Sequence, residues 1–343
     1  MRPLAILILS DDRPGHYHLA EGVAAAIARR RPIAVTKLSI SERRLTRGRV
    51  GAALLRVGVS PSRVLALGYG LSLHGLPRPD VVISAGGDTL NANVAVARHF
   101  AVPNIFCGTL RRLPPEAFSL VVSSYARHRD WPRHLVALKP NGMDPDALAK
   151  ERASRWQPGQ PPHLAGLLFG GDSGLFHYTD AEWQRLVAFL SESYATHGTR
   201  WIASTSRRSP THLAESLVAL AATANSPIAT LIDFRTAGPG TLATVFARAE
   251  AILCTEDSST MLSEAVCARL PVVGVAPLDH AFKVDEREYR HFMLREGWCR
   301  FVPLAALTPQ SFVAALAQVR PLTENHLDRL ATALQSRLPA LFG

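Results

Sequence analysis

Short apolar runs alternate with helical patterns along the whole of this chain. A strand that is buried on both faces is a continuous apolar run, and helical connections make neighbouring strands parallel. The alternation therefore predicts an α/β fold with parallel sheets covered by helices on both faces. The strands that we expect are Leu4–Ser10, Ile33–Leu38, Val81–Ala85, Asn104–Gly108, Leu120–Ser124, Leu135–Leu138, Leu164–Phe169, Trp201–Ser204, Ala229–Ile232, Ala251–Cys254, Val272–Val275 and Phe301–Pro303.

The length of 343 residues predicts two domains, because a domain usually holds about 100–200 residues. Prolines and glycines crowd the segment from Lys139 to His163, so we expect no packed element there. Each half has an apolar run leading into a Gly-Gly-Asp turn, which suggests two similar Rossmann-like domains. The predicted division is a domain over 1–150, a linker over 151–163, a second domain over 164–322 and a terminal helix within 323–343.

Composition indicates an ordered globular protein, since hydrophobic residues make up 47% and charged residues 19% of the chain. The first apolar run is too short for a signal sequence, and no stretch approaches the roughly 20 apolar residues of a membrane-spanning helix. The cysteines lie far apart, which argues against a disulfide framework or a zinc cluster. We therefore expect a cytoplasmic protein that is soluble or peripheral on a membrane.

Positive charge is concentrated near the start of the chain. The formal net charge is +10, and residues 1–60 contain eleven Lys or Arg against four Asp or Glu. Such a surface attracts nucleic acid, anionic lipid or a phosphorylated ligand, or it is simply a solvated face. The apolar segments Val50–Leu55 and Val57–Leu73 either rest on an anionic membrane or form an internal helix pair. The basic clusters are Arg29–Arg31, Arg43, Arg44, Arg47 and Arg49.

Polar side chains crowd the start of a predicted helix that follows the strand Ala251–Cys254. Backbone N–H groups and the positive end of the helix dipole favour a bound anion there, so this turn is a candidate for binding a diphosphate. Glu264 lies one turn after Thr260, where its carboxylate would accept hydrogen bonds from ribose hydroxyls. The alternative is that Asp257 and Ser258 only cap the helix and Glu264 is solvated. The candidate donor-binding residues of this turn are Glu256, Asp257, Ser258, Ser259, Thr260 and Glu264.

Two further turns follow predicted strands at the same edge of the second sheet. Glycines in one turn would let backbone amides approach a ligand closely. Arginines in the other would neutralise a departing diphosphate, because guanidinium groups bind phosphate bidentately. The alternative is a pair of surface arginines beside a helix start. The candidate residues of these turns are Gly170, Gly171, Asp172, Ser173, Ser206, Arg207 and Arg208.

The first half carries a candidate general base, His16, where its first strand ends. The ordinary pKa of a histidine, about 6.5, suits removal of a proton from an acceptor hydroxyl. Two alternatives are that Asp11 or Asp12 is itself the base, or that one of them orients His16. A third is that His16 has no catalytic role and is a hydrogen-bonded loop histidine. The candidate residues on this acceptor side also include Gly15, Gly86, Gly87, Asp88 and Thr89.

Metal-dependent and covalent mechanisms find little support. The only Asp-x-Asp sequence, Asp144 to Asp146, lies in the predicted linker and is interpreted as a turn. The chain has no H-E-x-x-H, Walker A or G-x-S-x-G motif, and its histidines are scattered. We expect no catalytic metal.

These blocks resemble a known family. Gly170–Ser173, Thr205–Pro210 and especially Thr255–Ala265, followed by Leu270–Val273 and Lys283, are similar to the family of the plant mitochondrial fission factor named for elongated mitochondria and its bacterial glycosyltransferase-like homologues. The resemblance runs along most of the chain.

More distantly, the layout is similar to the GT-B glycosyltransferases, such as the lipid II N-acetylglucosaminyltransferase. That resemblance implies two Rossmann-like domains facing across a cleft, with a nucleotide-diphosphate sugar on the second domain and the acceptor on the first. It implies that Gly15 and His16 belong to the acceptor loop and that Glu264 stands at the ribose-binding position. It also implies that the helix of residues 325–338 returns to the first domain.

We therefore expect a metal-independent glycosyltransferase that moves a sugar from a nucleotide-diphosphate sugar to a cell-envelope or lipid-linked acceptor. Inversion at the sugar is implied by the resemblance alone, and no cofactor is expected beyond the donor itself. A second hypothesis is a non-catalytic adaptor that keeps the fold and recruits a protein partner at a membrane. Generic nucleic-acid binding ranks last, because the basic segment carries no recognised binding motif, and no specific nucleic-acid partner is expected.

Overall fold

The computed structural model describes residues 2–43, 48–152 and 156–343. Contacts divide the chain into two compact units. The first unit comprises residues 1–142 and 326–343, and the second comprises residues 143–325. Arg44 and Arg47, two of the predicted basic residues, lie outside the described residues.

The first unit is built on a six-stranded sheet in the order β2-β1-β3-β4-β5-β6, and every pair of neighbours is parallel. Leu4 pairs with Ile33 on one side of β1, and Ile6 pairs with Val81 on the other. Because β1 is flanked by β2 and β3, the strand order reverses beside β1, which is where open α/β sheets bind ligands. The strands are β1 (Leu4–Ser10), β2 (Ile33–Ser39), β3 (Val81–Ala85), β4 (Asn104–Cys107), β5 (Leu120–Ser123) and β6 (His134–Val136).

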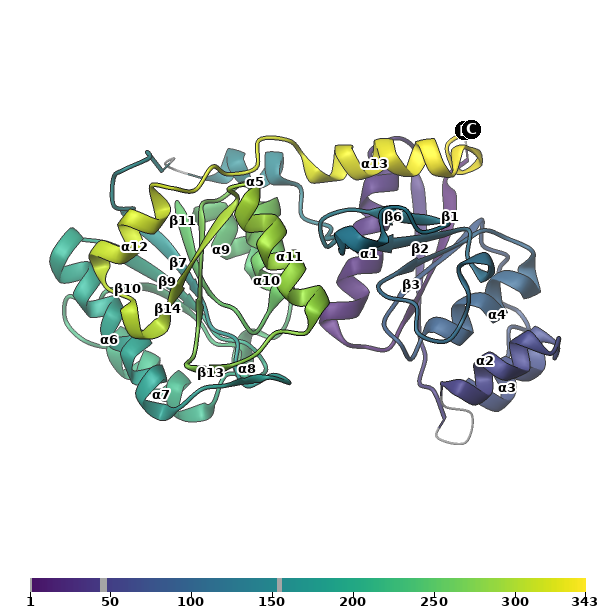
Figure 1. The fold of residues 1–343 in the computed structure, drawn as a ribbon, viewed down its shortest axis with the longest axis horizontal. Helices are drawn as coiled ribbons and strands as arrows, with labels where there is room; N and C mark the ends of the chain where they lie inside the picture. Colours follow the sequence, from purple (N-terminus) through teal and green to yellow (C-terminus); the bar gives the residue numbers. More distant parts are fainter. Residues whose placement is uncertain (1, 44–47, 153–155) are drawn as a thin grey trace. The chain divides into compact units, whose positions relative to one another are not determined.

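Helices cover both faces of this first sheet (Figure 1). Ile6 and Ile8 pack with α1 and α13, whereas Leu7 and Leu9 pack with the side of α2, α3 and α4, as the two-residue period of a strand requires. The last helix of the chain, α13, lies beside α1 in this unit. The helices are α1 (Pro14–Ala28), α2 (Arg49–Arg56), α3 (Pro61–Tyr69), α4 (Leu90–Phe100) and α13 (His326–Arg337), with 3₁₀ turns at Pro115–Ala117, Ala126–His128 and Pro339–Leu341.

The second unit repeats the design with a parallel sheet in the order β10-β9-β7-β11-β12-β14. Here the strand order reverses beside β7, between β9 and β11. Two-residue strands, β8 and β13, form a separate antiparallel pair. The strands are β7 (Leu164–Leu168), β8 (Phe176–His177), β9 (Arg200–Ser204), β10 (Ile228–Ile232), β11 (Ala251–Thr255), β12 (Val272–Ala276), β13 (Asp279–His280) and β14 (Cys299–Pro303).

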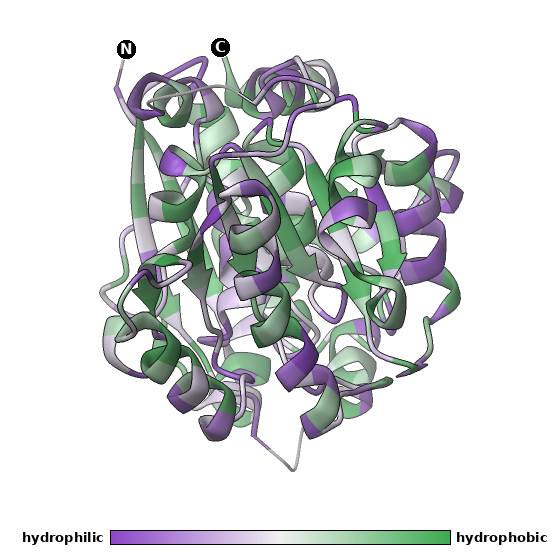
Figure 2. Cartoon of the chain, turned by 90° about the vertical axis from the view of Figure 1, so that its left-hand side faces the viewer, coloured by the Kyte–Doolittle hydropathy of each residue, from purple (hydrophilic) through white to green (hydrophobic). Residues whose placement is uncertain are grey.

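The core of the second unit is apolar and rich in aromatic rings. Trp201, Phe189 and Phe312 are fully buried and contact one another. Figure 2 shows the strands mostly in hydrophobic colours, whereas the helices carry both hydrophobic and hydrophilic residues. The helices are α5 (Pro145–Glu151), α6 (Asp180–His197), α7 (Thr211–Ala221), α8 (Phe234–Ala237), α9 (Leu242–Arg248), α10 (Ser259–Cys267), α11 (Val284–Arg295) and α12 (Pro309–Leu316), with a 3₁₀ turn at Leu304–Ala306.

All twelve expected strands are confirmed, with ends that shift by at most two residues. Thr179 followed by Glu182 predicts a capping box, and Thr308 before Pro309 predicts a helix cap; both are confirmed. Ser209 before Pro210 likewise predicts a cap, but this prediction is wrong, because α7 begins at Thr211 and the Ser209 hydroxyl donates to the carbonyls of Phe169 and Gly170.

The expectation of no packed element between Lys139 and His163 is also wrong. Helix α5 begins at Pro145, a proline at the first helical position, and the Asp144 carboxylate caps it by accepting the N–H of Asp146 at 3.0 Å. The Asp-Pro-Asp sequence is therefore a helix start. The structure groups α5 with the second unit, whereas the predicted division lay at residue 150.

Among the helices of the described residues, none is long and apolar enough to cross a membrane. All four cysteines are buried thiols.

Candidate functional site

His16 and Asp11 form a hydrogen-bonded pair where β1 ends. Nδ1 of His16 lies 2.7 Å from Oδ2 of Asp11. The Asp11 side chain is 4% exposed and the His16 side chain 32% exposed, so the carboxylate is buried behind the ring. A histidine whose Nδ1–H is donated to a carboxylate keeps Nε2 as its proton acceptor. The geometry thus fits a general base that is oriented by Asp11.

Gly86 makes room for the His16 ring. A Cβ at this position would clash with Nδ1 of His16, and the backbone has a φ of +90°, which L side chains rarely adopt. Thr89 closes the same turn by donating its hydroxyl to the carbonyls of Ala85 and Gly86, both at 3.0 Å. The Gly-Gly-Asp-Thr turn after β3 is therefore brought against the predicted base. A Cβ at Gly15 or Gly87 would meet nothing within 4 Å.

Asp12 and Asp88 occupy other positions around this turn. Asp12 has a φ of +58° and accepts the Ser39 hydroxyl at 2.7 Å, so its carboxylate is bonded to the end of β2 and not to His16. Asp88 lies 3.4 Å from the Arg13 guanidinium, and Arg13 in turn lies 4.0 Å from Asp11. Of the predicted bases, Asp11 and His16 are in contact.

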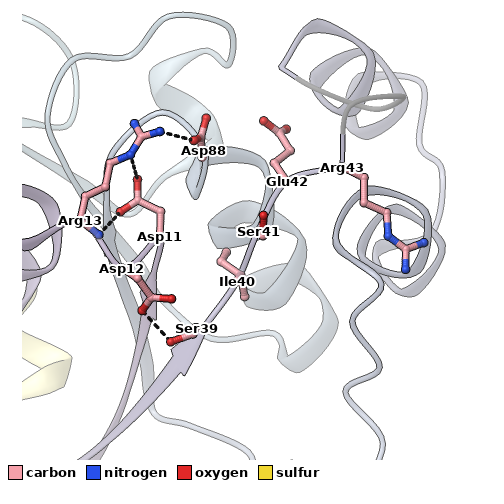
Figure 3. A pocket seen from close by; sticks show the side chains of 9 residues that line it. All are labelled: Asp11, Asp12, Arg13, Ser39, Ile40, Ser41, Glu42, Arg43 and Asp88. Atoms are coloured by element: carbon pink, nitrogen blue, oxygen red, sulfur yellow. Dashed lines mark hydrogen bonds and ion pairs between the residues drawn. The ribbon is translucent and has the colours of Figure 1, made fainter.

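A cavity of about 640 Å³ lies at the carboxyl end of the first sheet, where Asp11 is one of its lining residues (Figure 3). Sequence analysis missed the contribution of the turn after β2, because Ser39 to Glu42 belong to no motif. The cavity is lined by Asp11, Asp12, Arg13, Ser39, Ile40, Ser41, Glu42, Arg43 and Asp88.

In the second unit, Asp257 ties together the turns that follow β7, β9 and β11. Its carboxylate accepts the N–H of Gly171 at 3.2 Å and the hydroxyl of Tyr178 at 3.3 Å, and it pairs with the Arg208 guanidinium. The Asp257 side chain is fully buried. Burial raises the pKa of Tyr178, and the negative charge of Asp257 raises it further. Asp257 thus holds protein groups together instead of facing a ligand.

The Gly170 and Gly171 amides, which were predicted to approach a diphosphate, both donate to protein groups in the structure. The N–H of Gly170 donates to the Thr255 hydroxyl at 2.7 Å, and that of Gly171 donates to Asp257. A Cβ at either glycine would clash with the neighbouring loops, so both glycines serve close packing. Ser206 belongs to the same packing, since its hydroxyl donates to the Gly170 carbonyl at 3.0 Å.

The start of α10 remains accessible. Ser258 caps the helix by accepting the N–H of Met261 at 3.4 Å, and residues 258–260 are half-buried. Glu264, one turn further, is only 5% exposed, which corrects the alternative of a solvated carboxylate. The positive end of the helix dipole at this turn therefore remains a place for an anion.

Four more predicted donor residues lie on the turns that follow β7 and β9, at the same carboxyl edge of the sheet. Arg207 is exposed on the turn after β9, whereas Arg208 is held by Asp257. Asp172 is exposed and accepts the N–H of Tyr178 at 2.9 Å, and the neighbouring Ser173 is half-buried. Of the two arginines, Arg207 is the one whose charge is not already offset by Asp257.

Glu256 is buried beside Arg290, which sequence analysis missed. Nε of Arg290 lies 3.4 Å from Oε2 of Glu256, and the same guanidinium donates to the Glu256 carbonyl. Burial raises the pKa of Glu256 to about 7, although Arg290 opposes this shift. Arg290 lies in the middle of α11, and no local pattern distinguishes it from a surface arginine.

No group of three or more His, Cys, Asp or Glu side chains in the described parts of the chain is arranged to hold a metal ion. The arrangement in each unit is instead one of charged side chains and helix ends at a sheet's carboxyl edge.

Solved structures with a similar fold include a MurG and a UDP-GlcNAc 2-epimerase. MurG of Acinetobacter baumannii is 15% identical with a TM-score of 0.53, over 97% of this chain and 100% of that one. UDP-GlcNAc 2-epimerase of Methanocaldococcus jannaschii is 16% identical with a TM-score of 0.55, over 98% and 100%. The same enzyme in complex with UDP-GlcNAc and UDP is 14% identical with a TM-score of 0.52, over 98% and 100%. The chain therefore has the two-domain GT-B fold.

A family model described as mitochondrial fission ELM1 matches residues 14–338. The chain belongs to this family. No curated protein matches the chain.

Proposed function

We propose that the protein transfers a sugar from a nucleotide-diphosphate sugar to an acceptor hydroxyl without a metal ion. The observation that carries the proposal is the Asp11–His16 pair at the point where the strand order of the first sheet reverses, 2.7 Å between the interacting atoms. The second sheet offers its own reversal point at β7 and β11, next to the start of α10. One unit thus supplies a base, and the other supplies an anion site.

The donor is bound by the second unit. The diphosphate lies at the positive end of α10, near Ser258 and Thr260, with the exposed Arg207 offsetting its charge. Asp257 and Arg208 support this site from behind by holding the turns together. The M. jannaschii epimerase, which has the same fold, forms a complex with UDP-GlcNAc and UDP, and this supports the same class of donor here.

The acceptor is bound by the first unit. Nε2 of His16 removes the proton from the acceptor hydroxyl, and that oxygen forms a bond to the anomeric carbon of the sugar. The bond between this carbon and the diphosphate breaks, and the nucleoside diphosphate leaves with the electron pair. Preorganised positive groups at the leaving oxygens lower this barrier, each by about 2.7–4 kcal/mol.

The acceptor is a cell-envelope or lipid-linked molecule reached from the inner face of the cytoplasmic membrane. The region of helices α2 and α3 supports this part of the proposal, because Val50 in α2, Val57 directly after α2 and Leu67 in α3 are 47%, 77% and 56% exposed. The sequence from residue 43 to residue 79 contains seven arginines and no Asp or Glu. Exposed apolar side chains among cations suit an anionic lipid surface.

A non-catalytic adaptor is the second candidate function. Membership of the ELM1 family favours it, since that family is described by mitochondrial fission and not by a chemical reaction. In this case the fold would recruit a protein partner at a membrane, and a bound nucleotide would turn over no substrate.

Release of UDP from UDP-GlcNAc, measured with and without a cell-envelope extract as the source of acceptor, distinguishes the glycosyltransferase from the adaptor. An enzyme releases UDP, and His16→Ala abolishes the release while calorimetry still detects UDP binding. Binding of UDP-GlcNAc without release of UDP, and no release of the corresponding nucleotide from GDP-, dTDP- and CMP-linked sugars, would favour the adaptor.

A further inference from the structure

The buried guanidinium of Arg290 joins helix α11 to the turn that follows β11. The side chains of Arg290 and Glu256 are 5% and 7% exposed. One terminal nitrogen of Arg290 donates to the carbonyl and to Oε2 of Glu286, both at 3.0 Å, and the other donates to the carbonyl of Glu256. Nε of Arg290 also lies 3.4 Å from Oε2 of Glu256. Arg290 thus contacts both the backbone and the carboxylate of Glu256.

Aromatic rings lie against the same guanidinium. Cζ of Arg290 is 4.4 Å from the ring centroid of Phe282 and 5.9 Å from that of Phe176 in β8. A cation over an aromatic face is attracted to the ring, so these contacts restrict the guanidinium further. Rings and hydrogen bonds together therefore hold Arg290 in one position.

The position of Glu256 matters for the start of α10. Glu256 lies two residues before Ser258, which caps this helix. Its N–H donates to the carbonyl of Val275 at 2.8 Å, and its own carbonyl accepts from Arg290. Both backbone groups of Glu256 are thus held, and the turn leads directly to the first N–H groups of α10, which the proposed diphosphate site uses. Arg290 therefore acts on that site through Glu256.

The charge of this cluster depends on the protonation of Glu256. Arg290 carries one positive charge and pairs with Glu286 as well as with Glu256, so the three groups sum to −1 when Glu256 is ionised and to zero when it is protonated. Burial raises the pKa of Glu256 to about 7, against the opposing effect of Arg290. The other titratable groups around Glu256 are Asp257, which pairs with Arg208, and Tyr178, Cys254 and Cys299, whose pKa values burial raises.

We propose that Arg290 is a positioning residue for the diphosphate of the donor, and that the charge of Glu256, which Arg290 holds in place, regulates donor binding. Ionised Glu256 puts a negative charge beside the turn at the start of α10, and this charge repels the diphosphate. Protonated Glu256 removes the repulsion, while its carbonyl still accepts from Arg290. Donor binding is therefore coupled to proton uptake and is tighter at pH 6 than at pH 8.5. This inference rests on the proposed function for the place of the donor.

Calorimetric titration of UDP-GlcNAc into the full-length protein from pH 6 to pH 8.5 tests the proposal, because the diphosphate diester of this probe keeps its charge over that range. We expect wild-type affinity to fall at least about threefold across the range. Titrations at pH 7 in buffers of different ionisation enthalpy should show uptake of protons on binding. In Glu256→Gln the low-pH affinity should persist to pH 8.5, and the proton uptake should disappear.

Glu296→Gln is the matched control for this experiment. It changes an exposed carboxylate directly after the last residue of α11 and should keep the wild-type pH profile.

Arg290→Met tests the positioning role separately. The Glu256 carbonyl loses its donor, so affinity at pH 6 should fall at least about threefold. Loss of the positive charge also favours the protonated form of Glu256, so the decline in affinity should move to higher pH. A residue that only stabilises the fold would not shift this midpoint. Where circular dichroism shows that Arg290→Met does not fold, the comparison of Glu256→Gln with Glu296→Gln decides.

UDP-GlcNAc binding that does not change with pH would overturn this inference, and so would a Glu256→Gln variant with the wild-type pH dependence. Either result leaves the proposed function standing, because the donor still binds. A wild type that binds neither UDP-GlcNAc nor GDP- and dTDP-linked sugars would instead remove the proposed donor site, and this inference with it.

Discussion

Asp257 shows how one side chain can organise a site without contacting a ligand. Its carboxylate is fully buried and holds the Gly171 amide, the Tyr178 hydroxyl and the Arg208 guanidinium. The sequence could predict that residue 257 belongs to the site, because it follows a strand and precedes a helix. It could not predict these three contacts of Asp257, since the partner residues lie 49, 79 and 86 residues away in the chain.

Asp257→Asn should lower the free energy of unfolding by about 1–3 kcal/mol, because it leaves Arg208 without its counter-charge while one Arg208 face is exposed. Urea denaturation measures this change. Asp180→Asn is the matched control, with its side chain 81% exposed, and should change stability by less than about 0.5 kcal/mol. An equal loss of stability in the two variants would contradict the claim that the contacts of Asp257 stabilise the fold.

Glu256 should make stability depend on pH. Its pKa in the folded protein is raised to about 7 by burial, above the ordinary value of 4.5. Between these values the folded state holds a proton that the unfolded state has lost, so this contribution to stability is lost as the pH rises from about 4.5 to about 7. Above pH 7, ionisation of the buried Glu256 lowers the free energy of unfolding by about a few kcal/mol at most, because Arg290 pairs with the ionised carboxylate.

Glu256→Gln removes this titration. Denaturation curves at pH 5 and pH 8 should show the wild type losing more stability than the variant over this interval. An identical pH dependence in both proteins would show that Glu256 does not titrate there.

Gly86 should be required for the position of His16. In Gly86→Ala the new Cβ meets the ring and the residue keeps a strained φ, so we expect a loss of about 1–2 kcal/mol and a shift of the His16 ring signals in NMR spectra. Gly87→Ala is the control, because its Cβ would meet nothing within 4 Å and its φ is not positive. His16 signals that move equally in both variants would refute the contact.

At the scale of elements, local patterns predicted the strands well because each is a short apolar run with a clear end. Local patterns failed where tertiary contacts determine which residue begins a helix. The Ser209 hydroxyl is taken by carbonyls of the turn after β7, so it does not cap α7. Helix α5 carried a visible signal, an aspartate before a proline at the first helical position, but the surrounding prolines and glycines obscured it.

Helices α2 and α3 should bind anionic membranes if their exposed residues face lipid. The double variant Val50→Asp and Val57→Asp should reduce co-sedimentation with phosphatidylglycerol vesicles severalfold, because it removes apolar contact and adds negative charge. High salt should weaken wild-type binding in the same assay.

Val218→Asp, which changes a valine of α7 that is 50% exposed, is the matched control for this experiment. Wild-type protein that stays in the supernatant with anionic vesicles at low salt would contradict membrane binding by α2 and α3. Equal losses in the α2 and α7 variants would mean that the effect is not specific to α2.

At the scale of the whole molecule, two parallel sheets each carry charged loops at the edge where the strand order reverses. Repetition of strand, turn and helix made this architecture predictable from the sequence. The pairing of Glu42 with Gly48 and Asn91, and of Arg290 with Glu256, depends on chain segments that no periodicity connects. The central claim is that the start of α10 binds the diphosphate of a sugar nucleotide.

Calorimetric titration of UDP and UDP-GlcNAc into the wild type and Thr260→Glu tests this claim most directly. A carboxylate at the second residue of α10 favours the helix dipole but repels a diphosphate, so binding should fall at least tenfold while thermal stability is kept. Gln310→Glu places the same charge at the second residue of α12 and should leave binding unchanged. Equal UDP affinity of the wild type and the Thr260→Glu variant would contradict the claim, and so would a wild type that binds none of the UDP-, GDP- and dTDP-linked sugars.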